Sequence, residues 1–375
     1  MDNDNNIEDK NNDSLEIDKV NKEKAEKKDK NPTNKKSTII NIIFIVVIFV
    51  GLFIYMIAVD GIDNIIQLLS EIDYKWVLAG FGFLIINWIF EALTFHLPLK
   101  AAYKKQKFGN SFKISMIGLL FNNLTPFASG GQPMQAYEYA KSGHRASNAF
   151  SALAIKFIIV QSALVIFSFA VMIIEFNFFI DLLKDYLWIV ILSFIVNIIA
   201  IVFAILIGVN KKIVEAIIRP IVKFFGKIRI LKHPDETLEK LDKSIDNFAK
   251  QFSVMKSEKK MVVKTFIIAL FQCLSYYAIT YAVYRAFGNN EFGFWQIIPA
   301  QAVLLLIMTF IPTPGSGGGA EGGFLLIFNS IFKQGTINMS ILFWRIYTFY
   351  LPIIIGALFL IPVKRKIRNK KTFQK

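Results

Sequence analysis

Four ionisable side chains lie in or beside long apolar stretches, where charge is costly and is usually retained for function. Glu91, Lys156 and Arg345 each fall within an apolar run, and Glu321 follows a glycine-rich break in another. Opposite charges in such surroundings favour pairing with each other or with a charged ligand. We expect Glu321 to cap its helix, or to meet Arg345, a proton or a cationic headgroup. Glu91 is expected to pair either with Lys156 or with lysines of the following loop. Lys156 could instead extend its side chain to the membrane surface.

Two breaks rich in glycine and proline interrupt shorter apolar runs. They read LTPFASGGQPMQAY from Leu124 and PTPGSGGGAEGGF from Pro312. Backbone groups freed at such breaks need partners in protein or in a wet cavity, because lipid offers none. Free N–H groups at the start of a helix also attract an anion, and a lipid phosphate would fit both breaks. Asn122, Asn123, Gln132 and Tyr137 could hydrogen-bond a headgroup or satisfy the broken backbone. The predicted lipid- or anion-binding residues are Thr125, Pro126, Gly130, Gly131, Gln132, Tyr137, Thr313, Pro314, Gly315, Gly317, Gly318 and Gly319.

The two breaks resemble each other at a spacing of about 188 residues. Each begins with a Thr-Pro pair, and one gap then aligns a Ser-Gly-Gly triplet, residues 129–131, with residues 316–318. Each break follows a short apolar run and precedes a spanning run that carries one cation, Lys156 or Arg345. Broken segments at matching positions of two inverted units are typical of transporters and indicate a site near the bilayer midplane. We therefore predict repeat units at about 76–174 and 262–361.

The elements that must hold these residues are membrane helices. The chain of 375 residues is 54% hydrophobic, with a mean hydropathy of +0.47, which is too apolar for an ordinary soluble protein. Six runs of about 20 or more residues can each span a bilayer. They are Ile39–Ala58, Trp76–Leu97, Ser151–Ile174, Tyr186–Gly208, Val262–Arg285 and Met339–Ile361. The runs that lead into the breaks, 114–125 and 299–312, are shorter and predict re-entrant segments, with pairs of short spans as the alternative.

Loop charge predicts the orientation of these runs. Loops 98–113 and 209–260 and the C-terminal tail are basic, whereas loops 59–75 and 175–185 are acidic. Because basic loops stay in the cytosol, both termini are placed there and the two breaks enter from opposite faces. We thus predict an all-α polytopic integral membrane protein with about six spanning helices and two re-entrant segments in an inverted repeat. Its parts are a disordered cytosolic tail 1–38, a transmembrane domain 39–363 containing the cytosolic basic loop 209–260, and a basic cytosolic tail 364–375.

Composition argues against other classes of protein. The formal charge of +15 lies mainly in loops and tails, as a positive-inside topology requires, so no nucleic-acid partner is expected. One cysteine and three histidines without shared spacing predict no intrachain disulfide and no metal site. The sequence contains no P-loop, HExxH or dinucleotide fingerprint, so no cofactor is predicted.

The segments NNLTPFASGGQPMQAY and IPTPGSGGGAEGGF resemble the two signature segments of the lysylphosphatidylglycerol synthase transmembrane region, over about residues 39 to 365. That region is the flippase portion of the bacterial multiple peptide resistance factor. The resemblance implies movement of aminoacylated phosphatidylglycerol, or a related lipid, between leaflets of the bacterial plasma membrane. Such movement supports resistance to cationic antimicrobial peptides. Membrane lipids and a separate synthase protein are the implied partners.

Three alternatives stay open from the sequence. Full-length members of the family also esterify lysine from lysyl-tRNA to phosphatidylglycerol in a soluble domain. Neither segment 1–38 nor segment 209–260 is long enough for such a domain, so the chain is predicted not to be a phosphatidylglycerol lysyltransferase by itself. A lysyltransferase nevertheless remains the enzymatic alternative, and a non-transporting membrane scaffold is another. The short broken regions also allow a different lipid or an isoprenoid substrate.

Overall fold

The computed structural model describes residues 62–142, 144, 146–183, 187–210, 256–309 and 311–360, with Val50 and isolated residues between 212 and 253. All of them belong to one unit, Val47–Lys375. The secondary structure in these residues is helical throughout. The predicted tail 1–38, the first predicted span apart from Val50, most of loop 209–260 and the tail 364–375 lie outside the described residues.

The first repeat unit is a long helix, a broken hairpin and a second long helix. Its elements are α4 (Tyr74–Ala102), α5 (Phe108–Leu124), η1 (Pro126–Ala128), α6 (Gly131–Lys141) and α7 (Ala146–Ile174). The Asp73 carboxylate caps α4 by accepting the N–H of Lys75 at 2.9 Å, which satisfies one free donor of the first turn. A short helix, α3 (Ile62–Glu71), precedes this unit.

The second unit repeats this order. Its elements are α12 (Lys259–Ala286), α13 (Phe294–Met308), η3 (Pro314–Ser316), α14 (Gly319–Phe328), and then α15 (Ile337–Arg345), η4 (Ile346–Tyr350) and α16 (Leu351–Leu360). The last three follow one another without interruption, and η4 is a π-helical turn, a feature that often marks functional positions. Between the units lie α8 (Phe176–Leu183) and α9 (Leu187–Val209).

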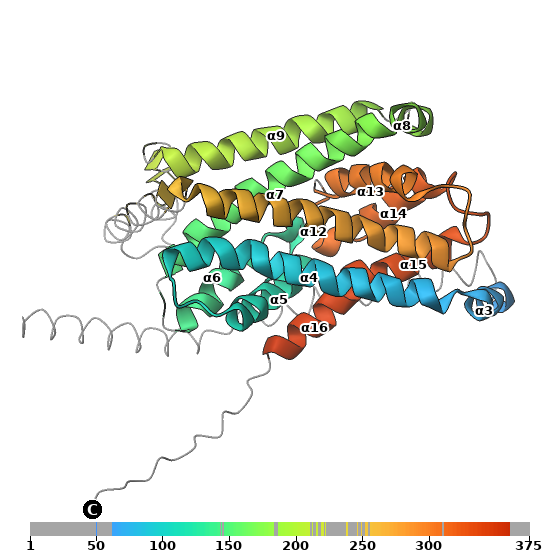
Figure 1. The fold of residues 1–375 in the computed structure, drawn as a ribbon, viewed down its shortest axis with the longest axis horizontal. Coiled ribbons are helices and arrows are strands. Elements are labelled where there is room, and N and C mark those ends of the chain that lie inside the picture. Colours follow the sequence, from blue (N-terminus) through green and yellow to red (C-terminus); the bar gives the residue numbers. More distant parts are fainter. Residues whose placement is uncertain are drawn as a thin grey trace, which may run out of the picture. The chain divides into compact units, whose positions relative to one another are not determined.

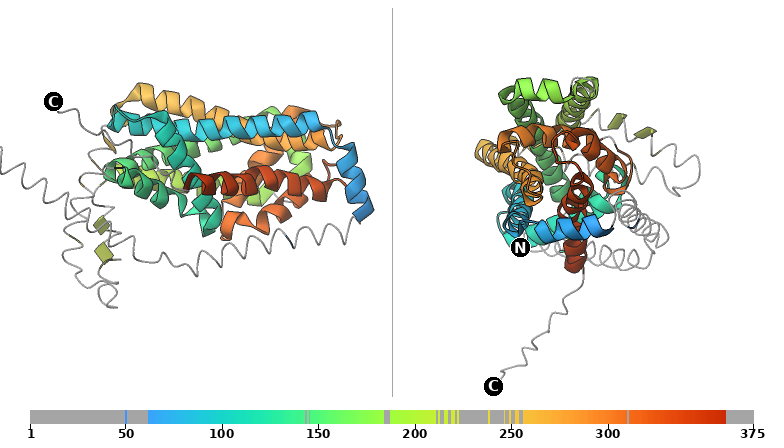
Figure 2. Two further views of the ribbon diagram at one scale, coloured as in Figure 1. Left: turned by 90° about the horizontal axis from the view of Figure 1, so that it is seen from below. Right: turned by 90° about the vertical axis from the view of Figure 1, so that its right-hand side faces the viewer.

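The two units run in opposite directions. Figures 1 and 2 both show α4 and α12 side by side. The N–H of Asp73, at the start of α4, donates to the carbonyl of Ala286, at the end of α12, with an N···O distance of 2.9 Å. Hairpin α5–α6 consequently starts from one end of the bundle and α13–α14 from the other (Figure 1). Their tips, η1 and η3, are in contact. This arrangement is the inverted repeat that the two similar breaks predict.

The predicted all-α polytopic architecture is confirmed. Five helical stretches are long and apolar enough to cross a membrane: Tyr74–Ala102, Asn148–Ile174, Leu187–Leu206, Lys259–Ala286 and Ile337–Leu360. They coincide with five of the six predicted spans, and the sixth prediction falls outside the described residues. The helices before the breaks are longer than the apolar runs that predicted them, because α5 begins at Phe108 and α13 at Phe294, in polar or mixed sequence.

Candidate functional site

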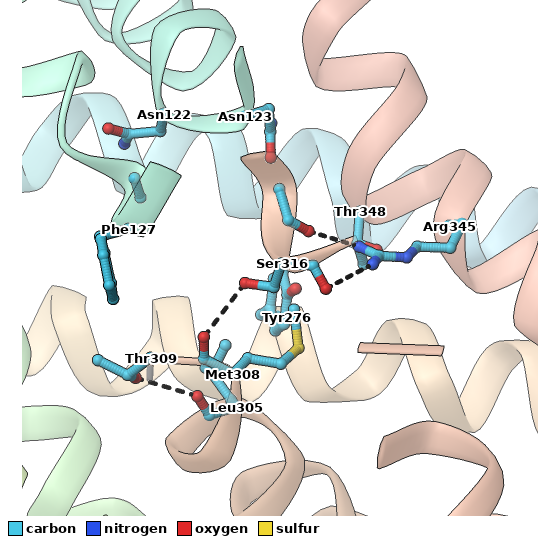
Figure 3. Close-up of a pocket in the computed structure, with 12 residues that line it drawn as sticks. Asn122, Asn123, Phe127, Tyr276, Leu305, Met308, Thr309, Ser316, Arg345 and Thr348 are labelled. Carbon is cyan, nitrogen blue, oxygen red and sulfur yellow. Dashed lines mark hydrogen bonds between the residues drawn. The ribbon is translucent and has the colours of Figure 1, made fainter. Parts of the chain in front are cut away.

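A cavity of about 250 Å³ lies where the tips of the two hairpins meet. It receives residues from both breaks, from the middle of α12, from the end of α13 and from the π-helical turn. Arg345 is the only charged residue among those that line it (Figure 3). The lining residues are Asn122, Asn123, Phe127, Ala128, Tyr276, Leu305, Met308, Thr309, Gly315, Ser316, Arg345 and Thr348.

Arg345 is held against the second break by three hydrogen bonds. Its Nε donates to Oε1 of Glu321 at 2.6 Å. Its two terminal nitrogens donate to the carbonyls of Gly315 at 3.0 Å and Ser316 at 3.4 Å (Figure 3). Arg345 is only 2% exposed. A guanidinium carries five N–H donors, so two remain beyond these three bonds for a group in the cavity.

Glu321 both caps the N-terminus of α14 and pairs with Arg345, which are two of the roles predicted for it. It lies in the first turn of α14, where its Oε2 accepts the N–H of Gly318 at 2.7 Å, while Oε1 accepts from Arg345. Negative charge is stabilised at a helix N-terminus, and the same carboxylate neutralises a buried cation. One carboxylate therefore fixes the second break to the helix that carries Arg345.

Packing next to the second break holds α14 and α15 together. The rings of Phe324 on α14 and Trp344 on α15 lie 5.0 Å apart between centroids, and both side chains are fully buried. Gly315 has φ +57°, and a Cβ there would lie 1.9 Å from Cε2 of Phe349. Both its conformation and its close approach to Phe349 therefore require glycine. These contacts leave the carbonyls of the break facing Arg345 rather than a helical partner.

The two breaks share a left-handed backbone at two matching positions and differ at the two residues that follow, where Gly130 has φ −81° and Gly318 has φ 82°. Phe127 has φ 53° and ψ 23°, and Gly315 has φ 57° and ψ 23°. The next residues, Ala128 at φ 50° and Ser316 at φ 55°, are also left-handed. The helices that follow begin at Gly131 and Gly319. In each break, four positions separate the first left-handed residue from the first residue of the following helix. The two motifs therefore align without a gap. The predicted gap is wrong, because it aligned the serines rather than the left-handed residues.

The glycine amides of the first break already have acceptors. The N–H of Gly130 donates to Oγ1 of Thr125 at 2.8 Å, and that of Gly131 donates to Oδ1 of Asn122 at 3.0 Å. In the second break, Oγ1 of Thr313 donates to the carbonyl of Gly317 at 2.8 Å. Side chains thus satisfy part of the broken backbone, and Arg345 is the donor that an anion in the cavity would meet.

The structure separates the predicted site residues into two groups. Of the predicted residues, Asn122, Asn123, Gly315 and Arg345 line the cavity, while Glu321 contacts it through Arg345. The others form the turns and helix starts around it or, as with Gln132 and Tyr137, lie exposed on α6. Their role in lipid binding stays a prediction. The members outside the lining are Thr125, Pro126, Gly130, Gly131, Gln132, Tyr137, Thr313, Pro314, Gly317, Gly318 and Gly319.

Glu91 and Lys156 form a second ion pair, away from the residues that line the cavity. Nζ of Lys156 donates to Oε1 of Glu91, and Nε2 of Gln272 donates to Oε2 of the same carboxylate at 2.8 Å. The side chains of Lys156 and Glu91 are 12% and 11% exposed, so Lys156 does not extend into solvent. The cluster links α4, α7 and α12, and Thr94 approaches Oε1 of Gln272 at 3.5 Å. It joins helices of both units.

Sequence reasoning missed Tyr276, Thr309 and Thr348 as lining residues. Thr348 follows Arg345 by three positions, so helical spacing places both on one face. Tyr276 follows Gln272 by four positions in a predicted span, which is a similar signal. Polar residues that share a face with an intramembrane charge could have been added to the site on this basis.

Comparison with known proteins gives one family match and several similar proteins. Residues 41–356 match the model of the lysylphosphatidylglycerol synthase TM region. A UPF0104 membrane protein of Methanocaldococcus jannaschii is 24% identical over 330 residues, covering 85% of this chain and 95% of that protein. One from Pyrococcus horikoshii is 21% identical over 324 residues, covering 84% and 95%. One from Methanothermobacter thermautotrophicus is 24% identical over 279 residues, covering 73% and 81%.

Proposed function

The chain belongs to the family of the lysylphosphatidylglycerol synthase transmembrane region and is a multi-pass membrane protein, and from this premise we propose that it moves lipid headgroups between membrane leaflets. The observation that carries the proposal is the cavity at the meeting tips of two inverted, broken hairpins, with Arg345 as its one charged lining residue. Irregular backbone at membrane depth is tolerated where it is buried in protein or lines a wet cavity. In transporters built from inverted repeats, such breaks surround the substrate site.

The headgroup we propose is that of aminoacylated phosphatidylglycerol, such as lysyl-phosphatidylglycerol, or of a related phospholipid. Its phosphate binds the two free N–H groups of Arg345, because charge-assisted hydrogen bonds from a guanidinium to phosphate oxygens are strong and geometrically specific. Asn122, Asn123 and Thr348 add polar groups along the cavity. The acyl chains stay in the bilayer while the headgroup crosses.

The setting that we propose is a bacterial plasma membrane, with both chain ends in the cytosol. There the protein works beside a separate synthase, which makes the aminoacylated lipid. Export of such a lipid lowers the negative charge of the outer surface, and this supports resistance to cationic antimicrobial peptides by weakening their attraction to the membrane.

Reconstitution into liposomes tests the proposal. Labelled lysyl-phosphatidylglycerol and phosphatidylglycerol are placed in one leaflet, and their appearance in the other is followed by a membrane-impermeant quencher. We expect exchange above that of empty liposomes, and a loss of most of it in Arg345→Gln. Exchange no faster than in empty liposomes for every lipid tried would refute the proposal and favour a scaffold.

Arg285→Gln is the matched control. Arg285, like Arg345, is an arginine near a helix end, but it is only partly buried, stacks on Trp76 with 4.9 Å to the ring centroid and donates to the hydroxyl of Tyr281 at 3.0 Å. It does not line the cavity. We therefore expect this variant to exchange lipid at the wild-type rate. The enzymatic alternative is tested in parallel, because new lysyl-lipid in cells that lack a synthase would favour a lysyltransferase.

A further inference from the structure

A buried polar side chain stands at the same place in both units, and each has one atom without a hydrogen-bond partner. Ser115 is the eighth residue of α5, and Gln301 is the eighth residue of α13. Both are 0% exposed. Among the described residues, nothing bonds to Oγ of Ser115 or to Nε2 of Gln301. A buried polar group without a partner costs free energy, so its presence at matching positions of both units requires an explanation.

Gln301 lies one helical turn beyond the cavity. Its Oε1 accepts from Oγ1 of Thr280, on the neighbouring α12, at 2.7 Å. Leu305 lies four residues after Gln301 and Tyr276 four residues before Thr280, and both line the cavity (Figure 3). Residues four apart share a face of a helix. Thr280 and Gln301 are therefore the next layer of the same seam between α12 and α13.

Ser115 has the corresponding place in the first unit. Asn122, which lines the cavity, lies seven residues further along α5, or about two turns on the same face. One turn in the other direction, Oγ of Ser111 contacts Nδ1 of His96 on α4 at 3.0 Å. The same Oγ accepts from Nε2 of Gln106 at 3.0 Å. These groups form a polar seam between α4 and α5 that ends where α5 begins.

The two seams lead to opposite faces of the membrane. The units are inverted, so α5 and α13 begin at opposite ends of the bundle (Figure 1). The second seam also ends in polar groups. Four residues beyond Thr280, Oη of Tyr284 accepts the N–H of Phe292 at 2.9 Å, just before α13 begins. Each unit thus places a buried polar layer between the central cavity and its own end of the bundle.

We infer that the hydroxyl of Ser115 and the amide of Gln301 bind the phosphate of the lipid headgroup as it passes between the cavity and the two membrane faces. This inference rests on the proposed function and adds two headgroup-binding residues outside the cavity, one in each seam. Each residue supplies an O–H or N–H donor to an anionic phosphate oxygen, and such charge-assisted bonds are strong. Both side chains are fully buried here, so each seam is closed and opens as the headgroup enters it.

An unpaired donor responds to substitution differently from a donor in a structural hydrogen bond. A residue that only stabilises the fold lowers stability when its bonded polar group is removed. Removal of an unpaired buried group breaks no bond and relieves a desolvation cost. Stability and lipid exchange should therefore change in different ways at the two kinds of position.

Lipid exchange and thermal unfolding of the same full-length variants test the inference. In Gln301→Met and Ser115→Ala, we expect Tm to stay at or above that of the wild type. Thr280 keeps a partner in Gln301→Met, because its hydroxyl can donate to the carbonyl of Tyr276 in its own helix. Exchange of phosphatidylglycerol in liposomes should fall about ten-fold, the factor that one hydrogen bond to a charged group gives. Wild-type exchange in either variant would overturn the role of that residue.

The matched controls carry out the same substitutions where the polar group has a partner. Nε2 of Gln161 donates to Oδ1 of Asn197, and Oγ of Ser168 lies 3.3 Å from the hydroxyl of Tyr277. Neither Gln161 nor Ser168 lines the cavity. We expect Gln161→Met and Ser168→Ala to lower Tm and to leave exchange per folded protein at the wild-type rate. A fall in Tm at Gln301 as large as that at Gln161 would overturn the inference, because Gln301 would then be structural.

Sided labelling tests the two routes without a transport measurement. Cys273→Ala removes the single native thiol, and one cysteine is then introduced as Ser115→Cys, Gln301→Cys or Ser168→Cys. A membrane-impermeant thiol reagent is added to one side of phosphatidylglycerol proteoliposomes that hold the protein in one orientation. We expect Ser115→Cys and Gln301→Cys to react from opposite sides and Ser168→Cys from neither. Reaction of the first two from the same side, or from no side, would overturn the routes.

Failure of the routes is distinguishable from failure of the proposed function. If Arg345→Gln abolishes exchange but Gln301→Met and Ser115→Ala do not slow it, the proposed function stands and the two positions fall. If the wild-type protein exchanges no lipid between leaflets, the proposed function falls and the inference falls with it.

Discussion

Glu321→Gln isolates the charge of the carboxylate at the second break. The amide has nearly the same shape, but it cannot accept from both Gly318 and Arg345, whose bonds to Glu321 measure 2.7 and 2.6 Å. Removing one partner of a buried pair costs about 3–5 kcal/mol, because the other charge is left uncompensated. Arg345 keeps its two carbonyl partners, and the glutamine keeps one acceptor. We therefore expect a loss of about 2–3 kcal/mol.

Thermal unfolding in detergent measures this loss. For a chain of this size, a change of about 2–3 kcal/mol corresponds to a fall in Tm of about 3–4 °C. The control is Glu71→Gln, because the Glu71 side chain is exposed and accepts from Gln67 at 2.8 Å in a local contact within α3. Surface changes of this kind stay within about 0.5 kcal/mol.

A double variant sharpens the same prediction. Glu321→Gln combined with Arg345→Gln removes both charges, so the penalty of an isolated buried cation disappears. We expect the double variant to be more stable than the sum of the two single losses predicts. Strict additivity, or a Glu321→Gln variant as stable as Glu71→Gln, would refute the ion pair as the connection between the break and α15.

Three further outcomes are expected. Gly315→Ala should lower Tm by several degrees because its φ is +57° and its Cβ has no room, whereas Gly322→Ala, which has nothing within 4 Å of the added Cβ, should leave Tm unchanged or raise it. Ala128→Gly should raise stability by up to about 1 kcal/mol in chemical unfolding, since φ is +50° there; a clear loss would contradict the left-handed turn. Lys156→Met should destabilise the protein, because it leaves the buried carboxylate of Glu91 without its cation. Adding Glu91→Gln should recover most of the lost stability, and a thermal-shift comparison of the single and double variants measures this.

Much of the fold follows from local sequence. Apolar runs of sufficient length predict the spanning helices, and five of them coincide with helices of the described residues. Glycine and proline predict the two breaks, because few other residues interrupt an apolar helix. The start of α5 at Phe108 was not predictable in this way, since residues 108–113 are polar or mixed and become helical through packing in the bundle.

The site was only partly predictable, because it depends on how helices are rotated against each other. Glu321 and Arg345 stood out as charges in apolar runs, yet sequence could not choose among their potential partners. The acceptors of the glycine amides, Thr125 for Gly130 and Asn122 for Gly131, lie five and nine residues away and meet them only after the chain turns back. The alignment of the breaks failed for a related reason, since Phe127 and Gly315 match in backbone angles and not in residue type.

The contact between α4 and α12 has a consequence for how such a chain arises. The side chain of Asn87 donates to the carbonyl of Gln272 at 3.0 Å, and these residues are 185 positions apart. The first residues of the two helices have the same spacing. Asn87 and Gln272 therefore occupy matching positions of α4 and α12, and they contact each other. Residues at matching positions meet where the two-fold axis that relates the two units passes between the helices. An interface of this kind also suits two separate copies of one ancestral unit inserted in opposite orientations, which is the symmetry of an isologous dimer. Fusion of the copies removes the requirement for identical halves, so each half is free to acquire its own charge pair, Glu91 with Lys156 in one and Glu321 with Arg345 in the other.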